Sequence, residues 1–156
     1  MANTQCMVTS FKKEILNGSH AFGAQAANAT RTVTTKDNFK AALFLATATR
    51  DATDTAYNNT GELAATGNYT QGGIAVTNAT APNSSGTTAF WTPSASLVWN
   101  ALTSSGAFDA VVIYNDSSTG KLEVSIHTFG SQTISNGTFT LTMPTNDAST
   151  GLLRIA

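Results

Sequence analysis

The sequence predicts an all-β fold, a β-sandwich of the jelly-roll or immunoglobulin-like type, with a short N-terminal helix and an extended arm. From Phe39 onward, apolar residues recur at every second position, which is the period of a strand. About seven or eight such segments are separated by turns rich in Gly, Asn and Ser. A chain of 156 residues can bury a core without disulfides, and its single Cys6 has no internal partner.

The segment "TSFKKEILNG" predicts the helix. Thr9 or Ser10 can serve as the N-cap, and Gly18 ends the helix. Phe11 and Ile15 lie four residues apart and share one face. A helix of about two turns is too short to persist without a surface to pack on.

The next segment, "AFGAQAANATRTVTT", has small residues and no clear period, which indicates an extended arm. We therefore divide the chain into residues 1–38, a helix and arm that act as an assembly element outside the core, and residues 39–156, the β-sandwich domain.

The first predicted strand is "FKAALFLATA", with Phe39, Ala41 and Leu43 on one face and Phe44 on the other. "SLVWNAL" is also strand-like. "FDAVVIYN" is apolar on both faces, so we expect a strand that is central or covered.

Apolar and polar residues alternate in "KLEVSIHTF", which follows the turn-rich "NDSSTG". We expect the apolar set to point inward and the polar set outward. These sets are Leu122, Val124 and Ile126, and Glu123, Ser125 and His127.

Asn136-Gly137 is the preferred pair for a two-residue type I′ hairpin turn. After it, Phe139, Leu141 and Met143 alternate with threonines and predict a strand. "GLLRIA" predicts the last strand.

Charged residues make up only 11% of the chain, against roughly 25% in ordinary soluble domains. The net charge of −1 provides no basic surface for nucleic acid, and no apolar run approaches the ~18 residues of a membrane span. No signal peptide is visible. A surface of Thr, Ser and Asn suits a protein packed into an assembly, because ordering these side chains costs little entropy.

No pattern in the sequence predicts a catalytic residue, a metal site or a cofactor. Asp51, Asp54 and Glu62 offer oxygen ligands to calcium, but they lack the alternating spacing of a calcium loop, and Asp also caps turns. His20 and His127 are interpreted as surface or hydrogen-bonding residues.

Four aromatic residues are candidates for stacking on sugars: Tyr57, Tyr69, Trp91 and Trp99. The simpler interpretation is that Trp99, within an apolar strand, belongs to the core and that Trp91, before Pro93, lies at a loop edge.

Four segments occur in a characteristic order: "FKAALFLATATRDATDTAYNNTGE", "GGIAVTNAT", "FDAVVIYND" and "TFTLTMPTNDASTGLLRIA". Together with an N-terminal "FK.E.L.G.H.F" pattern, they resemble a family of small virion proteins of tailed bacteriophages. The residues of that pattern are Phe11, Lys12, Glu14, Leu16, Gly18, His20 and Phe22.

The resemblance implies a capsid decoration, or cement, protein without enzymatic activity. It would bind the outside of a phage head and stabilise contacts between major capsid subunits. Its partners would be the major capsid protein and neighbouring copies of itself, in a trimer for example, and not nucleic acid or membrane. It would be made in the cytoplasm of the host bacterium and reside on the capsid surface.

Two alternatives remain open. One is a phage tail or fibre component that binds host-surface glycans, and the other is a weakly active hydrolase. For the decoration role, the candidate partner-binding residues are the apolar side chains of the N-terminal segment: Phe11, Ile15, Leu16 and Phe22.

Overall fold

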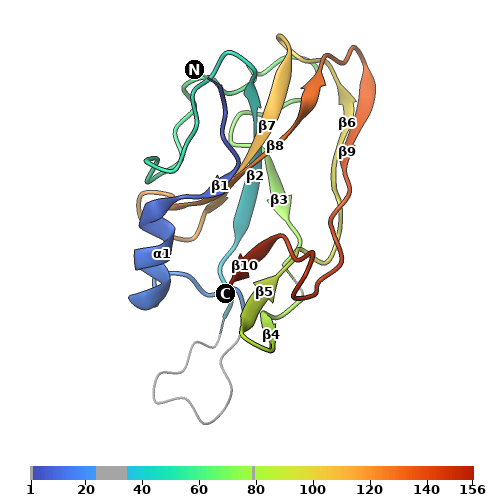
Figure 1. Ribbon diagram of the computed structural model, residues 1–156. Helices are drawn as coiled ribbons and strands as arrows, with labels where there is room; N and C mark the ends of the chain where they lie inside the picture. The colour runs from blue at the N-terminus through green and yellow to red at the C-terminus, as the bar shows by residue number, and fades with distance from the viewer. Residues whose placement is uncertain (1, 24–34, 79) are drawn as a thin grey trace.

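The computed structural model describes residues 2–23, 35–78 and 80–156, and it consists of antiparallel strands with one short helix (Figure 1). The predicted all-β class is confirmed. In chain order, the elements are β1 (Cys6–Met7), α1 (Thr9–Leu16), β2 (Phe39–Leu45), β3 (Ile74–Val76), β4 (Asn83–Ser85), β5 (Thr88–Trp91), β6 (Leu97–Leu102), β7 (Phe108–Asn115), β8 (Glu123–Gln132), β9 (Gly137–Leu141) and β10 (Leu153–Ile155).

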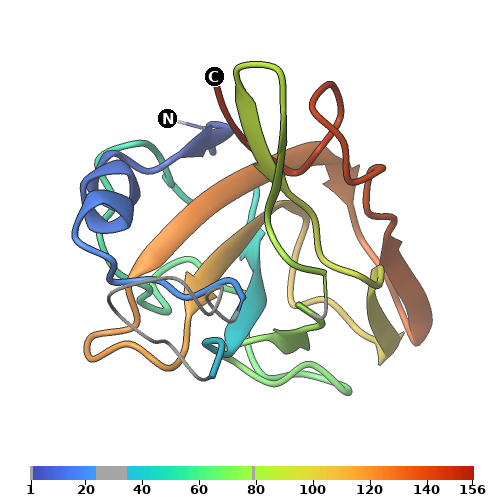
Figure 2. The ribbon, with the colours of Figure 1, turned by 90° about the horizontal axis from the view of Figure 1, so that it is seen from below.

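The strands form three sheets. The largest has five strands in the order β1-β8-β7-β2-β3, the second has three in the order β10-β5-β4, and the third pairs β6 with β9. In both Figure 1 and Figure 2, α1 lies at one side of the molecule and the β6–β9 pair at the other.

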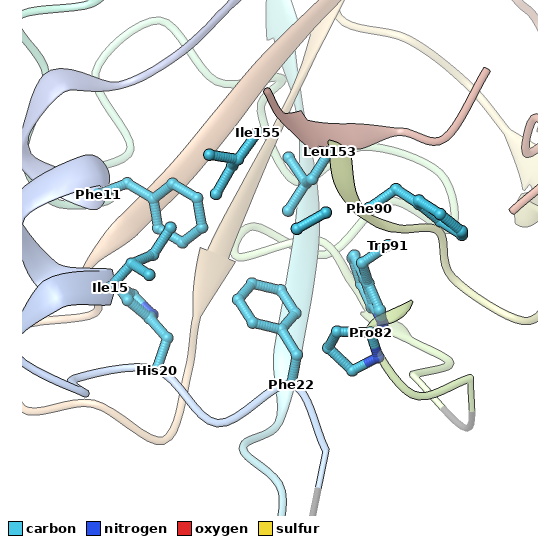
Figure 3. Close-up of a pocket in the computed structure, with 10 residues that line it drawn as sticks. Phe11, Ile15, His20, Phe22, Pro82, Phe90, Trp91, Leu153 and Ile155 are labelled. Atoms are coloured by element: carbon cyan, nitrogen blue, oxygen red, sulfur yellow. The ribbon is translucent and has the colours of Figure 1, made fainter. Parts of the chain in front are cut away.

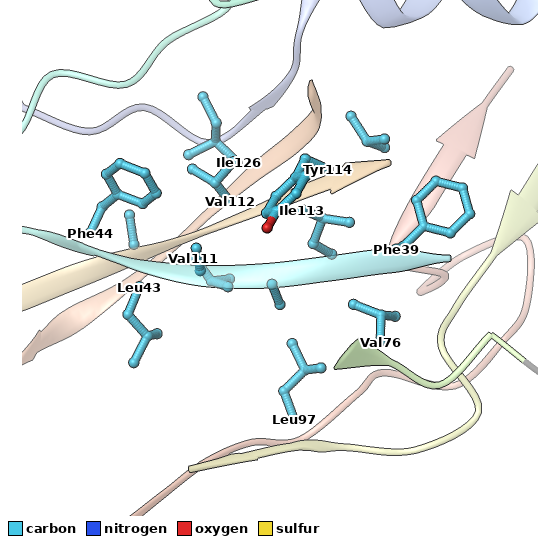
Figure 4. Packing of buried hydrophobic residues seen from close by; sticks show 14 of the residues in the cluster. Phe39, Leu43, Phe44, Val76, Leu97, Val111, Val112, Ile113, Tyr114 and Ile126 are labelled. Carbon is cyan, nitrogen blue, oxygen red and sulfur yellow. The ribbon is translucent and has the colours of Figure 1, made fainter. Parts of the chain in front are cut away.

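The centre of the large sheet is the pair β2–β7, as the apolar character of both strands predicts. Leu43 pairs with Val111, and every residue of β7 except Asp109 is buried. Figure 4 shows Phe44 and Val112 on one face of the sheet and Leu43 on the other. Because both faces of the sheet are covered here, neither strand requires a row of polar residues facing solvent.

The N-terminal segment belongs to this core, and the prediction that it lies outside is wrong for residues 2–23. Cys6 pairs with Ile126 at the edge of the large sheet, and the Val8 N–H donates to the Val124 carbonyl at 3.2 Å. Val8 and Phe11 are 0% and 1% exposed. Most of the predicted arm falls at residues 24–34, outside the described residues.

The helix ends where the sequence predicts. Gly18 has a φ of 66°, the left-handed conformation that terminates a helix. Its start differs, because Val8 occupies the N-cap position and no side chain caps the first turn. The Ser10 hydroxyl instead donates to the Asp54 carbonyl, which ties the helix to the loop after β2.

The expected outward face of β8 is also wrong, because Glu123 and Ser125 are fully buried. The loop after β2 covers this strand and brings the Arg50 guanidinium into an ion pair with Glu123. The alternation of apolar and polar residues along β8 cannot reveal that a loop covers its polar face. The covering residues lie about 70 positions away in the sequence.

The type I′ hairpin at Asn136-Gly137 is not formed. Asn136 has the positive φ of 49° that such a turn requires, but Gly137 does not, and it begins β9 instead. β9 pairs with β6, which places Phe139 opposite Trp99. Packing of these two large rings in the core favours the pairing of β9 with β6, and it outweighs the local preference of Asn136-Gly137 for a hairpin turn.

Candidate functional site

An aromatic cluster joins the N-terminal segment to the sheets. Phe22 stacks on Phe39 with ring centroids 4.4 Å apart, and it meets the edge of Trp91 at 4.8 Å. Phe11 lies 5.9 Å from Phe22 and 5.0 Å from His20. Helix α1 is therefore held to β2 and β5 by ring contacts.

His20 anchors this cluster through both ring nitrogens. Its Nε2 lies 2.8 Å from a Glu14 carboxylate oxygen, and its Nδ1 lies 3.1 Å from the Asn115 side-chain amide. The side chain is 1% exposed, so the hydrogen-bonding interpretation holds and the surface interpretation does not. Because both ring nitrogens have partners and the side chain is buried, His20 is a structural residue.

Beside the cluster is an apolar cavity of about 220 Å³ (Figure 3). It lies between α1 with the following segment on one side and β5 with β10 on the other. Its lining comprises Phe11, Ile15, His20, Phe22, Pro82, Ala89, Phe90, Trp91, Leu153 and Ile155.

A larger groove of about 430 Å³ continues from this cavity toward the surface, and Ile15 and Ile155 line both. We call it the α1–β10 groove. Leu16 is 88% exposed and Ile155 45% exposed along it. Its lining comprises Met7, Lys12, Ile15, Leu16, Arg154, Ile155 and Ala156.

The structure divides the four predicted partner-binding residues into two groups. Ile15 and Leu16 line the α1–β10 groove and are accessible. Phe11 is buried in the chain's own core, and Phe22 is half-buried against Phe39. The prediction of Phe11 as a partner-binding residue is therefore corrected, and Phe11 is a core residue. Its side chain points from the helix toward the sheets and packs against the rings of His20 and Phe22.

The three carboxylates considered for calcium have separate partners. Asp51 accepts hydrogen bonds from Thr53, and Asp54 lies 3.3 Å from the Arg50 guanidinium. The Glu62 carboxylate, in contrast, lies in a network of tyrosines. Among the described residues, no group of three or more His, Cys, Asp or Glu side chains is placed to bind a metal ion.

Glu62 is the centre of a buried hydrogen-bond network. Its carboxylate accepts from the Tyr57 hydroxyl at 2.5 Å, the Tyr69 hydroxyl at 2.6 Å and the Gly72 N–H at 2.8 Å. Tyr57 also stacks on Tyr114 at 4.2 Å. Burial and the nearby carboxylate raise the pKa of Tyr57 and Tyr69 well above the usual range, so both hydroxyls stay protonated as donors.

The loop "DATDTAYNNTGE" is thus a structural element. Its aspartates organise turns, and its Tyr57 and Glu62 fasten it onto the large sheet.

Sequence reasoning missed a Ser–His pair on β8. The Ser125 hydroxyl lies 2.9 Å from His127 Nε2. Ser125 is fully buried, so no substrate can reach its oxygen. Burial lowers the pKa of His127 to about 4, which keeps the ring neutral near pH 7. Residues two apart on a strand point to the same face, and this spacing was the signal in the sequence that could have identified the pair. The pair has a structural role.

Cys6 lines a hollow of about 420 Å³ next to this pair, together with His127 and Arg154. Burial raises the pKa of its thiol, and the Glu123 carboxylate raises it further. The sulfur is therefore held as a thiol, the less nucleophilic form.

The aromatic residues considered for sugar binding are mostly buried. Trp91, Trp99 and Tyr69 are 2%, 4% and 3% exposed. The prediction of Trp99 as core is confirmed, and Trp91 is the last residue of β5, directly before the following loop, with its side chain buried.

Among the described residues, no helix has the length and apolar character needed to cross a membrane. No protein-family model matches the chain, and no match was found among curated proteins or solved structures.

Proposed function

We propose that the protein is a structural virion protein of a tailed bacteriophage, a β-sandwich that decorates the capsid and stabilises contacts between major capsid subunits. The observation that carries the proposal is the α1–β10 groove. It presents accessible apolar side chains, Leu16 and Ile155, on a chain whose other large apolar side chains are mostly in the core. A surface of this kind suits docking onto a larger assembly.

The low charge supports the same role. With 11% charged residues, few ion pairs are available to an interface, so apolar anchors and neutral hydrogen bonds would hold it. The sequence resemblance to phage virion proteins supports the identity of the assembly.

The buried network around Glu62 and the ion pair between Arg50 and Glu123 also suit a scaffold. The ion pair joins residues 73 positions apart, and the network ties its loop to the large sheet because Tyr69 accepts from the Leu43 N–H of β2 and Tyr57 stacks on Tyr114 of β7. Each requires the folded arrangement, and this favours a single rigid shape for docking.

The glycan-binding alternative lacks comparable support. It requires exposed aromatic faces, whereas both tryptophans are buried and Tyr57 is stacked on Tyr114 with its hydroxyl bonded to Glu62. No observation favours a hydrolase.

The test is the copy number of the protein in purified particles of the phage that encodes it, measured by quantitative mass spectrometry. A decoration protein is expected in hundreds of copies per particle and on heads that lack tails. A few copies per particle, found with tails alone, would refute the capsid role and support the tail alternative.

A further inference from the structure

Strand β10 is an unshielded sheet edge that faces the α1–β10 groove. Among the described strands, it pairs with β5 on one side and with none on the other. In Figure 1, β10 lies between β5 and α1. Three consecutive residues, Arg154 to Ala156, line the groove from the β10 side, and α1 lines it from the other. The backbone of β10 therefore borders an open channel.

The two faces of β10 differ in chemistry. Leu153 and Ile155 line the apolar cavity beside Phe11, and Figure 3 shows Ile155 extending toward that ring. Arg154, between them, does not line that cavity; it lines the groove and the hollow that contains His127. A strand placed alongside β10 would thus meet an apolar surface on one face and a cation on the other.

The cations of the groove lack carboxylate partners. Arg50 is paired with Glu123, and Lys40 and Lys121 with Asp116. Lys12 and Arg154 have no carboxylate within ion-pair distance among the described residues, and the Arg154 guanidinium donates to the Ser149 carbonyl. The groove therefore complements a negative charge.

We propose that the α1–β10 groove binds an extended segment of a partner protein as an additional strand on β10, and that this segment presents apolar, acidic and apolar side chains in succession. Backbone hydrogen bonds to β10 provide the attachment. The two apolar side chains enter beside Leu153 and Ile155, and the acidic one pairs with Arg154.

A second copy of the chain does not fit this description. Two β10 strands paired antiparallel about their central residue would bring Arg154 against Arg154, with Lys12 lining the groove of each copy, and like charges opposite one another are destabilising. The same charge protects the short edge from indiscriminate association.

The inference deepens the proposed function, because it names the kind of capsid segment that would be bound, and it depends on that function only for the identity of the partner.

The test uses two synthetic peptides, acetyl-Thr-Thr-Val-Glu-Val-Thr-Thr-amide and the same peptide with Lys in place of Glu. Binding is followed by two-dimensional NMR of the full chain. We expect the acidic peptide to shift the resonances of Ile15, Leu16 and Leu153–Ile155, with about fivefold tighter binding than the Lys peptide. In Arg154→Glu, the preference should reverse. The matched control Lys36→Glu, at an exposed lysine that does not line the groove, should retain it.

The apolar contact is tested with Ile155→Asp, which should weaken binding at least about tenfold. Val98→Asp is its control, since Val98 is 39% exposed on β6. Leu16→Asp provides a second groove variant at a side chain that is almost fully exposed. Absence of binding, equal binding of the two peptides, or shifts elsewhere would overturn the proposal. So would a dimer in solution that Ile155→Asp dissociates.

Sedimentation with undecorated phage heads separates the two proposals. If wild type and Ile155→Asp bind heads equally, the decoration role stands and the groove is not the binding site. If the peptide binds as expected but the chain does not bind heads, the groove assignment stands and the capsid role fails.

Discussion

Replacing Phe11 by Ala tests whether the N-terminal segment belongs to the core. The ring is 1% exposed and contacts the rings of His20 and Phe22 at centroid distances of 5.0 and 5.9 Å. Truncating a buried Phe to Ala typically costs about 3–5 kcal/mol, from lost burial and the cavity left behind. At about 2–4 °C per kcal/mol for a chain of this size, Tm should fall by roughly 6–20 °C.

The assay is urea unfolding followed by tryptophan fluorescence, with Tm from calorimetry. Leu16→Ala is the matched control, because Leu16 lies on the same helix and is 88% exposed. It should change stability by no more than about 0.5 kcal/mol.

The alternative outcome is that α1 unfolds separately from the rest of the chain. If α1 detaches from the rest of the chain before the core unfolds, Phe11→Ala would leave the main transition unchanged and alter only the fluorescence of Trp91, which lies 4.8 Å from Phe22. An unchanged midpoint would refute the inclusion of residues 2–23 in one cooperative core and restore the division at residue 38.

Three further predictions concern the interior. Glu62→Ala leaves two tyrosine hydroxyls and one backbone N–H without their acceptor and should cost about 3 kcal/mol or more in urea unfolding, whereas Asp51→Ala should cost much less, since it removes an exposed turn contact. Gly73→Ala should prevent folding, as judged by circular dichroism, because its methyl would lie 1.8 Å from a carbonyl oxygen; Gly86→Ala, also at positive φ but with nothing within 4 Å, should fold at a cost of about 1 kcal/mol. The free energy of unfolding should decrease as pH falls from 6.5 toward 4 because of His127. Its pKa is about 4 in the folded state and about 6.5 in the unfolded chain, so in this range the unfolded chain binds the proton more strongly. The loss, up to about 3 kcal/mol in urea midpoints, should disappear in a Gln variant at this position; an equal pH dependence in that variant would contradict the assignment.

The sequence by itself determined the strands whose signal is local. β2, β6, β7 and β10 lie where alternating or continuous apolar residues predict them, and Gly18 ends α1 as expected. In these segments side-chain period and backbone preference agree, so neighbouring residues suffice. The aspartates of "DATDTAYNNTGE" likewise organise turns as their side chains predict.

Tertiary structure decided what long-range packing controls. Glu123 is buried because Arg50, distant in sequence, reaches it, and β9 pairs with β6 because Phe139 packs with Trp99 despite the Asn136-Gly137 turn signal. The same applies to the candidate site. The sequence identified Ile15 and Leu16 but not their partner β10, which lies well over 100 residues later in the chain. A groove between distant segments depends on how the sheets pack, and no local pattern encodes that.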